Sequence, residues 1–90
     1  MQNEPTPAEI LTAAAARKGW SPQDIEYRLS VLGCVVTAAT VRNWLADRSI
    51  PHDAARLALV PLFGLERDGF MVACASSTVR LAEQRIKKEW

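Results

Sequence analysis

Apolar residues recur at helical spacing along most of this 90-residue chain, and short capping sequences divide the pattern into segments. The first segment starts with Thr6, a proline and Glu9, an arrangement typical of a helix N-terminus. The helix should run to Lys18 and end at Gly19, because glycine readily adopts the left-handed conformation that closes a helix. Its buried side is predicted to consist of Ile10, Leu11, Ala14 and Ala15.

The same order of cap, proline and acidic residue recurs at residues 21–24, Ser-Pro-Gln-Asp. A second helix is therefore predicted from Pro22 to about Leu32, with Gly33 at its end. Its inward side should carry Ile25, Leu29 and Leu32. Residues 34–36 form a short apolar connector, which we interpret as a loop that packs inward.

A third helix is predicted after Thr37, which can act as its N-cap. Val36 and Val41 are then spaced as the two residues of a hydrophobic staple. Asp47 stands where a glycine more commonly ends such a helix. One face of this helix should carry Val41, Trp44, Leu45 and Arg48.

A fourth helix is predicted after Pro51, with His52 or Asp53 as its cap. Pro61 lacks a backbone donor and should kink or end this helix. Residues 66–69, Glu-Arg-Asp-Gly, are expected to form a turn.

The last segment, residues 70–90, shows a helical pattern again. Its apolar face is predicted to consist of Met71, Ala75, Val79, Ala82 and Ile86. Its outer side should carry Arg80, Arg85, Lys87 and Lys88. Ser76 and Ser77 leave open whether this segment is one helix or a turn followed by a helix. The apolar face could pack on the preceding helices or pair with a second subunit.

Five predicted helices and no convincing strand indicate an all-α fold. A content of 49% apolar and 23% charged residues is that of one ordinary soluble domain. We therefore expect a compact five-helix domain over residues 1–90, with a core over residues 6–65 and an additional C-terminal helix over residues 70–90.

The cysteine and histidine content argues against a metal site. Cys34 and Cys74 lie far apart in apolar surroundings, so buried thiols are expected, with a disulfide left open. His52 has no second ligand or nucleophile near it in sequence, which favours a capping or loop role. Paired carboxylates, a glycine-rich phosphate loop and a Ser/His/Asp motif are also missing from the sequence. We expect no enzyme, no cofactor, no metal and no small-molecule ligand.

The chain carries neither a signal peptide nor an apolar run long enough to span a bilayer, which predicts a cytoplasmic protein without membrane contact.

The most specific chemistry lies on the other face of the third helix. Ala38 and Ala39 are small and allow a backbone to approach a surface, while Arg42 and Asn43 can form bidentate hydrogen bonds to guanine and adenine in a major groove. Hydroxyls at a helix N-terminus also commonly contact phosphate. The candidate DNA-binding residues are Gln23, Thr37, Ala38, Ala39, Thr40, Arg42, Asn43 and Arg48.

Three segments together resemble the phage repressor and Cro-like family of helix-turn-helix DNA-binding domains. They are residues 40–51, Thr-Val-Arg-Asn-Trp-Leu-Ala-Asp-Arg-Ser-Ile-Pro, residues 19–25, Gly-Trp-Ser-Pro-Gln-Asp-Ile, and residues 51–65, which end in a Phe-Gly-Leu close. The resemblance covers residues 7–65 and implies a lambda-repressor-like fold, in which the third helix enters the major groove of double-stranded DNA. The connector between Leu29 and Val41 is longer than the family's tight turn by about two or three residues.

The charge balance bears on this function. A net charge of +1 is low for a DNA-binding domain, although Glu9, Asp24 and Asp53 belong to predicted helix starts and leave the basic residues free to cluster. Arg17, Lys18 and Arg28 are expected to be solvated. The negative charge of Asp47 near the phosphates should disfavour binding unless Arg48 offsets it.

The sequence thus favours a sequence-specific transcriptional regulator of phage or plasmid type, expected to act as a homodimer. The C-terminal helix is a candidate for the dimer contact, and its cationic end for contact with flanking phosphate. The alternative is a small helical protein–protein interaction module that keeps the fold without DNA binding, using the third helix or the C-terminal helix against a protein partner.

Overall fold

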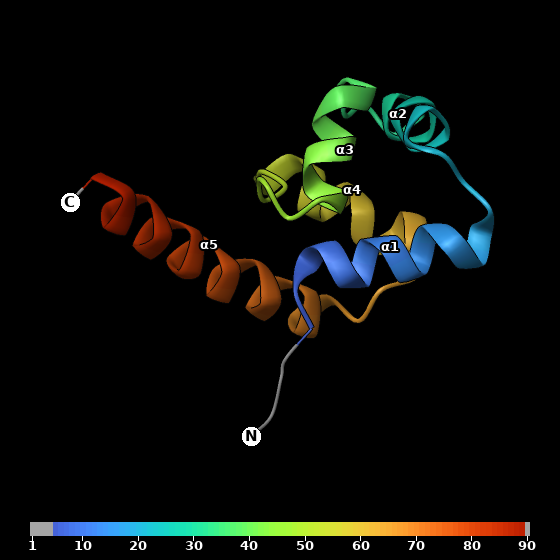
Figure 1. The fold of residues 1–90 in the computed structure, drawn as a ribbon. Coiled ribbons are helices and arrows are strands. Elements are labelled where there is room, and N and C mark those ends of the chain that lie inside the picture. The colour runs from blue at the N-terminus through green and yellow to red at the C-terminus, as the bar shows by residue number, and fades with distance from the viewer. Residues whose placement is uncertain (1–4, 90) are drawn as a thin grey trace.

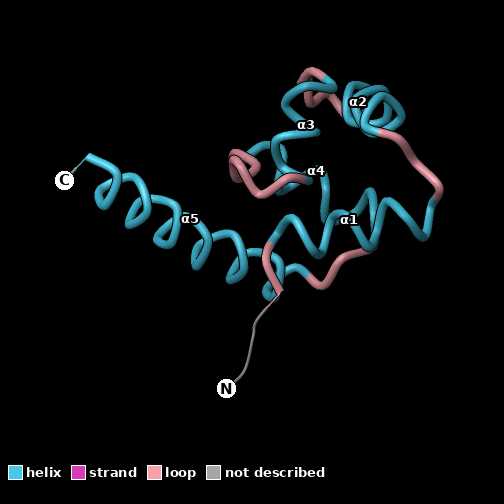
Figure 2. Tube along the Cα trace, viewed as in Figure 1, coloured by secondary structure: helices cyan, strands magenta, loops and turns pink. Residues whose placement is uncertain are grey.

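The computed structural model describes residues 5–89, and the regular structure in this part of the chain is entirely helical (Figure 2). The prediction of an all-α fold is confirmed. The helices are α1 (Pro7–Lys18), α2 (Pro22–Val31), α3 (Ala38–Leu45), α4 (Asp53–Phe63) and α5 (Arg67–Glu89).

The core lies where α3 is enclosed by its neighbours. Helix α3 packs against both α1 and α2, α4 packs against α2, and α5 contacts α1 and α4 through its first half (Figure 1). Leu29, Val41 and Leu59 are completely buried at the centre. The second half of α5 extends away from the other helices (Figure 1). The fold therefore consists of a four-helix body with one long projecting helix.

The three predicted N-caps are confirmed. The hydroxyl of Thr6 accepts a hydrogen bond from the backbone of Glu9, and the hydroxyl of Thr37 accepts one from the backbone of Thr40. Ser21 and Asp24 form a reciprocal capping box at the start of α2. Such caps satisfy backbone donors that have no partner inside the helix, and each contributes about 1 kcal/mol. The first three helix starts are thus fixed by local sequence.

Helix α4 begins in another way. His52 occupies the N-cap position, but its side chain makes no capping hydrogen bond. Instead, Nε of Arg56 donates to the carbonyl of Pro51 at 2.7 Å, and the Arg56 guanidinium lies 3.2 Å from the carboxylate of Asp53. An arginine one turn into the helix therefore ties its start to the preceding loop.

Four helices end in the same backbone motif, in which a residue in the left-handed conformation follows the last turn. Glycine holds this place after α1, α2 and α4, whereas Asp47 holds it after α3 with φ of 61°. The backbone N–H groups of Asp47 and Arg48 donate to the carbonyls of Trp44 and Asn43. Asp47 therefore ends α3, as predicted, at some cost in backbone strain.

The end of α2 corrects one predicted core residue. The helix stops at Val31, and the left-handed Gly33 reverses the chain so that the backbone of Cys34 bonds to the carbonyl of Leu29. Leu32 is therefore 51% exposed, and Cys34 takes the buried place. The connector packs inward only in part, because Val35 is exposed.

Two predicted ends of helical structure are absent. Pro61 lies inside α4, which continues to Phe63 before Gly64 ends it. Residues 66–69 do not form a separate turn, because α5 begins at Arg67. The Glu66 carboxylate accepts from the backbone of Gly69 and serves as the cap. Ser76 and Ser77 do not interrupt α5.

The face of α5 that packs on the body is not the predicted apolar face, for which such packing was one of two alternatives. Phe70, Ala73 and Cys74 are buried together with Ser77, whereas Val79 and Ile86 of the predicted face are more than half exposed. The buried residues are mostly small, which allows α5 to approach α1 and α4 closely. The apolar stripe that dominated the sequence pattern therefore lies on the opposite side of the helix. The predicted end of this helix, Trp90, lies outside the described residues.

Cys34 and Cys74 are both free and buried, as expected. Burial raises the pKa of the Cys74 thiol, which keeps it protonated and unreactive at neutral pH.

The capping box of α2 makes the stability of the fold depend on pH. The Ser21 backbone N–H donates to the Asp24 carboxylate at 2.9 Å and the Ser21 hydroxyl donates at 3.1 Å, and these bonds lower the pKa of Asp24. A carboxylate with a lowered folded-state pKa stabilises the fold above its unfolded pKa and loses this effect as pH falls through the folded value. The stability difference between the native chain and Asp24→Asn should therefore be full at pH 6 and shrink below about pH 4. Urea unfolding at both pH values measures it, and a difference independent of pH would contradict it.

Candidate nucleic-acid interface

The inner face of α3 is anchored in the core. Val41 is completely buried, and Trp44 is 2% exposed. The ring of Trp44 lies against His52 from the start of α4, with 6.5 Å between the ring centroids. The predicted inner face is confirmed for Val41 and Trp44, while Leu45 is partly buried. Arg48, predicted to share this face, is exposed and lies beyond the end of the helix.

The outer face of α3 carries the predicted candidate residues in two groups. Ala38, Ala39 and Thr40 form the first turn, and Arg42 with Asn43 lies in the last turns. Ala39 and Arg42 are exposed, whereas Ala38, Thr40 and Asn43 are partly buried. The two small alanines leave the backbone of the first turn open to approach, next to the one cation of the helix.

Both threonine hydroxyls at the start of α3 are partly engaged. The Oγ1 atoms of Thr37 and Thr40 lie 3.1 Å apart, and Thr37 Oγ1 also caps the Thr40 backbone at 3.1 Å. The hydroxyl pair is exposed, so each oxygen keeps capacity for a further hydrogen bond. This positions two hydroxyls at the positive end of the helix dipole.

Two candidates lie apart from this cluster. Gln23 is exposed in the first turn of α2, and Arg48 is exposed after α3. Among the described residues, no hydrogen bond joins either side chain to the outer face of α3. The structure therefore brings together Thr37, Ala38, Ala39, Thr40, Arg42 and Asn43, with Gln23 and Arg48 at the periphery.

An ion pair at the end of α3 was missed by sequence reasoning. Arg80 of α5 donates through Nη2 to the Asp47 carboxylate at 2.8 Å and to the hydroxyl of the buried Ser77 at 3.1 Å. Arg80 therefore faces inward and does not belong to the predicted outer cationic side of α5. Arg80 offsets the negative charge of Asp47, the role that the sequence left to Arg48.

A second unpredicted contact involves an arginine expected to be solvated. The guanidinium of Arg28 lies over the ring of Trp20, 4.1 Å from its centroid, and the same ring packs against Phe63 at 5.2 Å. Cation–π contacts at exposed sites contribute about 0.5–1 kcal/mol. Trp20 thus connects α2 with the end of α4.

Other kinds of site find little support in the described part of the chain. Between residues 5 and 89, groups of three or more His, Cys, Asp and Glu side chains that could hold a metal ion do not occur. None of the helices described there is both long and apolar enough to cross a membrane.

The arrangement can place a small, cationic and hydroxyl-bearing helix face against an extended polyanionic surface. Val41 and Trp44 anchor that face to the body. Asp47, at the end of α3, pairs with Arg80 of α5. Comparison with known protein families, with curated proteins and with solved structures found no match to this chain.

Proposed function

We propose that this protein binds double-stranded DNA through the outer face of α3 and acts as a sequence-specific transcriptional regulator of phage or plasmid type. The observation that carries the proposal is the division of α3 into two faces. One face is locked into the core by Val41 and Trp44, and the other presents small side chains beside Arg42.

The chemistry of the outer face suits base reading in a major groove. An α-helix fits the groove, and the absence of bulky side chains at Ala38 and Ala39 permits close approach of the backbone. Arg42 can donate two hydrogen bonds to guanine, and Asn43 can pair with the edge of adenine. The hydroxyls of Thr37 and Thr40 would then meet phosphate oxygens at the start of the helix.

The near-neutral net charge is compatible with this proposal because acidic groups are held elsewhere. Residues 37–46 contain no aspartate or glutamate. Glu9, Asp24 and Asp53 lie in the first turns of α1, α2 and α4, and the charge of Asp47 is paired with Arg80. The outer face of α3 therefore meets the polyanion without a free carboxylate of its own.

The test has two steps, both on the full chain. Fluorescence anisotropy with random duplex DNA at about 50 mM and 200 mM salt measures electrostatic binding, which should weaken with salt. Selection from a random duplex pool then yields a preferred site. Replacing both Arg42 and Asn43 by alanine should reduce affinity for that site by at least about 30-fold, since each of the two bidentate contacts contributes about 1–3 kcal/mol and about 1.4 kcal/mol corresponds to a tenfold change.

Arg17→Ala together with Thr12→Ala supplies a matched control, because both residues are exposed on α1 and the same charge is removed. This control should keep the affinity for the selected site within about twofold. Binding that is undetectable at low salt, or equal losses in both double variants, would refute the proposed DNA interface.

One observation favours a second candidate function, a protein-interaction module. Leu32 and Leu57 are each more than half exposed, and together with Pro61 they line a shallow groove between the end of α2 and α4. Solvent-exposed leucines grouped in this way are characteristic of protein-binding surfaces. This candidate predicts a protein partner whose binding is lost in Leu57→Glu and unchanged in the Arg42/Asn43 double variant, which is the reverse of the pattern expected for DNA.

A further inference from the structure

The outward side of α5 carries a continuous apolar stripe. Val72, Val79 and Ile86 are 54%, 59% and 56% exposed, and the intervening Ala75 and Ala82 are exposed as well. By helical periodicity this stripe lies opposite the face that packs on the body through Phe70, Cys74 and Ser77. Helix α5 therefore has two apolar sides, and the rest of the described chain covers one of them.

The spacing along the stripe is that of a coiled-coil seam. Its five residues lie three and four positions apart in alternation, which gives a period of about 3.5 residues. The β-branched residues Val72, Val79 and Ile86 occupy one seam position throughout, and alanines occupy the other. β-branched side chains at the first seam position favour two-stranded coiled coils, and the pairing is strongest where leucine fills the second position. Such a seam packs against a second helix with the same repeat.

The far half of α5 has little support within the described chain. Each side chain from Ala82 to Lys87 is exposed, and beyond Arg80 the helix only borders a pocket in which Leu81, Ala82 and Arg85 lie opposite residues 48–50. Helical segments of this length are marginal in water without packing along one face. The only apolar face available to this half is the stripe, so a stable helix here calls for a partner along it.

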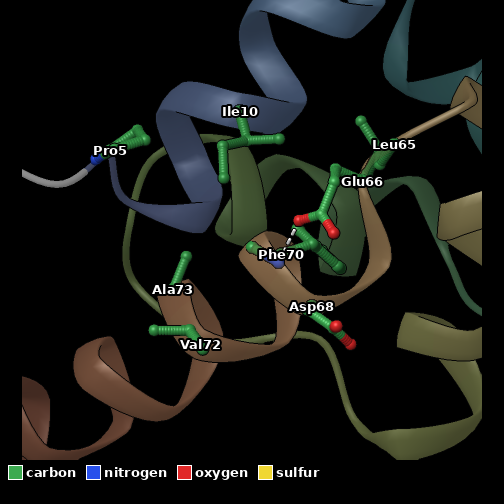
Figure 3. A pocket seen from close by; sticks show the side chains of 9 residues that line it. Pro5, Ile10, Leu65, Glu66, Asp68, Phe70, Val72 and Ala73 are labelled. Atoms are coloured by element: carbon green, nitrogen blue, oxygen red, sulfur yellow. Dashed lines mark hydrogen bonds between the residues drawn. The ribbon is translucent and has the colours of Figure 1, made fainter.

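The stripe also continues into an apolar groove at the start of α5 (Figure 3). Val72 belongs to both features, and the groove is further lined by Ile10, Leu65 and Phe70. In Figure 3, Pro5 and Ile10 lie on one side of it and Val72 with Ala73 on the other. The groove extends the apolar surface from the projecting helix onto the body.

We infer that the stripe of Val72, Ala75, Val79, Ala82 and Ile86 pairs with the same stripe of a second copy of this chain. Its self-complementary repeat fits a twofold interface, in which the same patch serves both partners. Glu83 and Arg85 lie on opposite flanks of the seam. Among the described residues, no other charged side chain occupies a flanking position. Specific dimers bury about 1,200–2,000 Å² in total, so the interface requires the stripe together with its flanks and the groove.

The inference is independent of DNA binding and is tested without DNA. Sedimentation equilibrium of the full chain from about 1 to 500 µM should show a monomer–dimer equilibrium with Kd on the order of 10 µM, as expected for a small interface. Val79→Glu should raise this Kd by at least about 30-fold, because it buries a charge in the seam. At a concentration where the native chain and the Val79→Glu variant are both monomeric, circular dichroism should show the same helical content for the two.

Gln84→Glu is the matched control, since it adds the same charge to an exposed position of α5 off the seam. It should dimerise like the native chain. Ala82→Leu is a gain-of-function variant and should tighten the dimer by about tenfold, because leucine fills the second seam position. A native chain that stays monomeric over the whole range, or a Val79→Glu variant that dimerises normally, would overturn the inference.

Discussion

Trp44→Ala is expected to lower the free energy of unfolding by about 3–5 kcal/mol, the range for large aromatic side chains removed from a core. Trp44 is 2% exposed and lies among Val41, the core of α1 and α2, and the His52 ring. Since small domains have a total stability of about 5–15 kcal/mol, such a loss would unfold a large fraction of the molecules or leave little margin. DNA affinity should fall in parallel, because α3 loses the anchor that fixes its outer face.

Urea unfolding followed by circular dichroism measures this change. Val35→Ala is the control, because Val35 is 86% exposed and its truncation should change stability by less than about 0.5 kcal/mol. A loss below about 1 kcal/mol for Trp44→Ala would mean that the tryptophan is not the anchor of α3.

Phe70→Ala is expected to cost about 3–5 kcal/mol as well, with a different consequence. Phe70 is 1% exposed and is among the largest fully buried side chains of the described chain. It belongs to the same apolar cluster as Leu11 and Leu59, so it fastens the first turn of α5 to α1 and α4. Removing it opens a cavity where the first turns of α5 join the body.

Two readouts distinguish this variant. Urea unfolding should show the loss of stability, and limited proteolysis should cleave within α5 before the body, because the helix is released first. Val72→Ala, two residues along the same helix, is the control, since its side chain is 54% exposed. Equal stability losses in both variants would show that α5 is held along its stripe and not by Phe70.

The sequence predicted the features whose causes are local. The caps at Thr6, Ser21 and Thr37 depend on three or four consecutive residues, and each was placed correctly. The inner face of α3 followed from the spacing of Val41 and Trp44, which lie on one side of the helix and are both buried.

The errors arise where tertiary packing chooses between local alternatives. Pro61 is tolerated because it removes one hydrogen bond of a helix whose other residues, among them Leu59 and Phe63, are buried. Helix α5 has two apolar faces, and the larger apolar side chains, from which the pattern was read, lie on the exposed one. The face that packs on the body is that of Ala73, Cys74 and Ser77, whose small side chains permit close contact with α1 and α4.

The candidate site shows the same division. The exposure of Ala39 and Arg42 could be predicted from helical periodicity alone. The pairing of Asp47 with Arg80 could not, because the two residues lie 33 positions apart and Arg80 had been assigned to the outer side of α5. Only the folded chain shows that the charge at the end of α3 has a partner.

That ion pair also joins two surfaces that would otherwise be unrelated. Asp47 ends α3, and Arg80 lies on α5 one residue beyond Val79 of the stripe. A shift of α5 on pairing of two copies would act on this ion pair, and so on the end of the helix that carries Arg42. Thermodynamic linkage makes such an effect mutual, so a DNA site that favours one orientation of α3 would strengthen the dimer by the same factor as the dimer strengthens DNA binding. An Asp47→Asn variant would then respond less to protein concentration in its DNA affinity, while each surface on its own stayed intact.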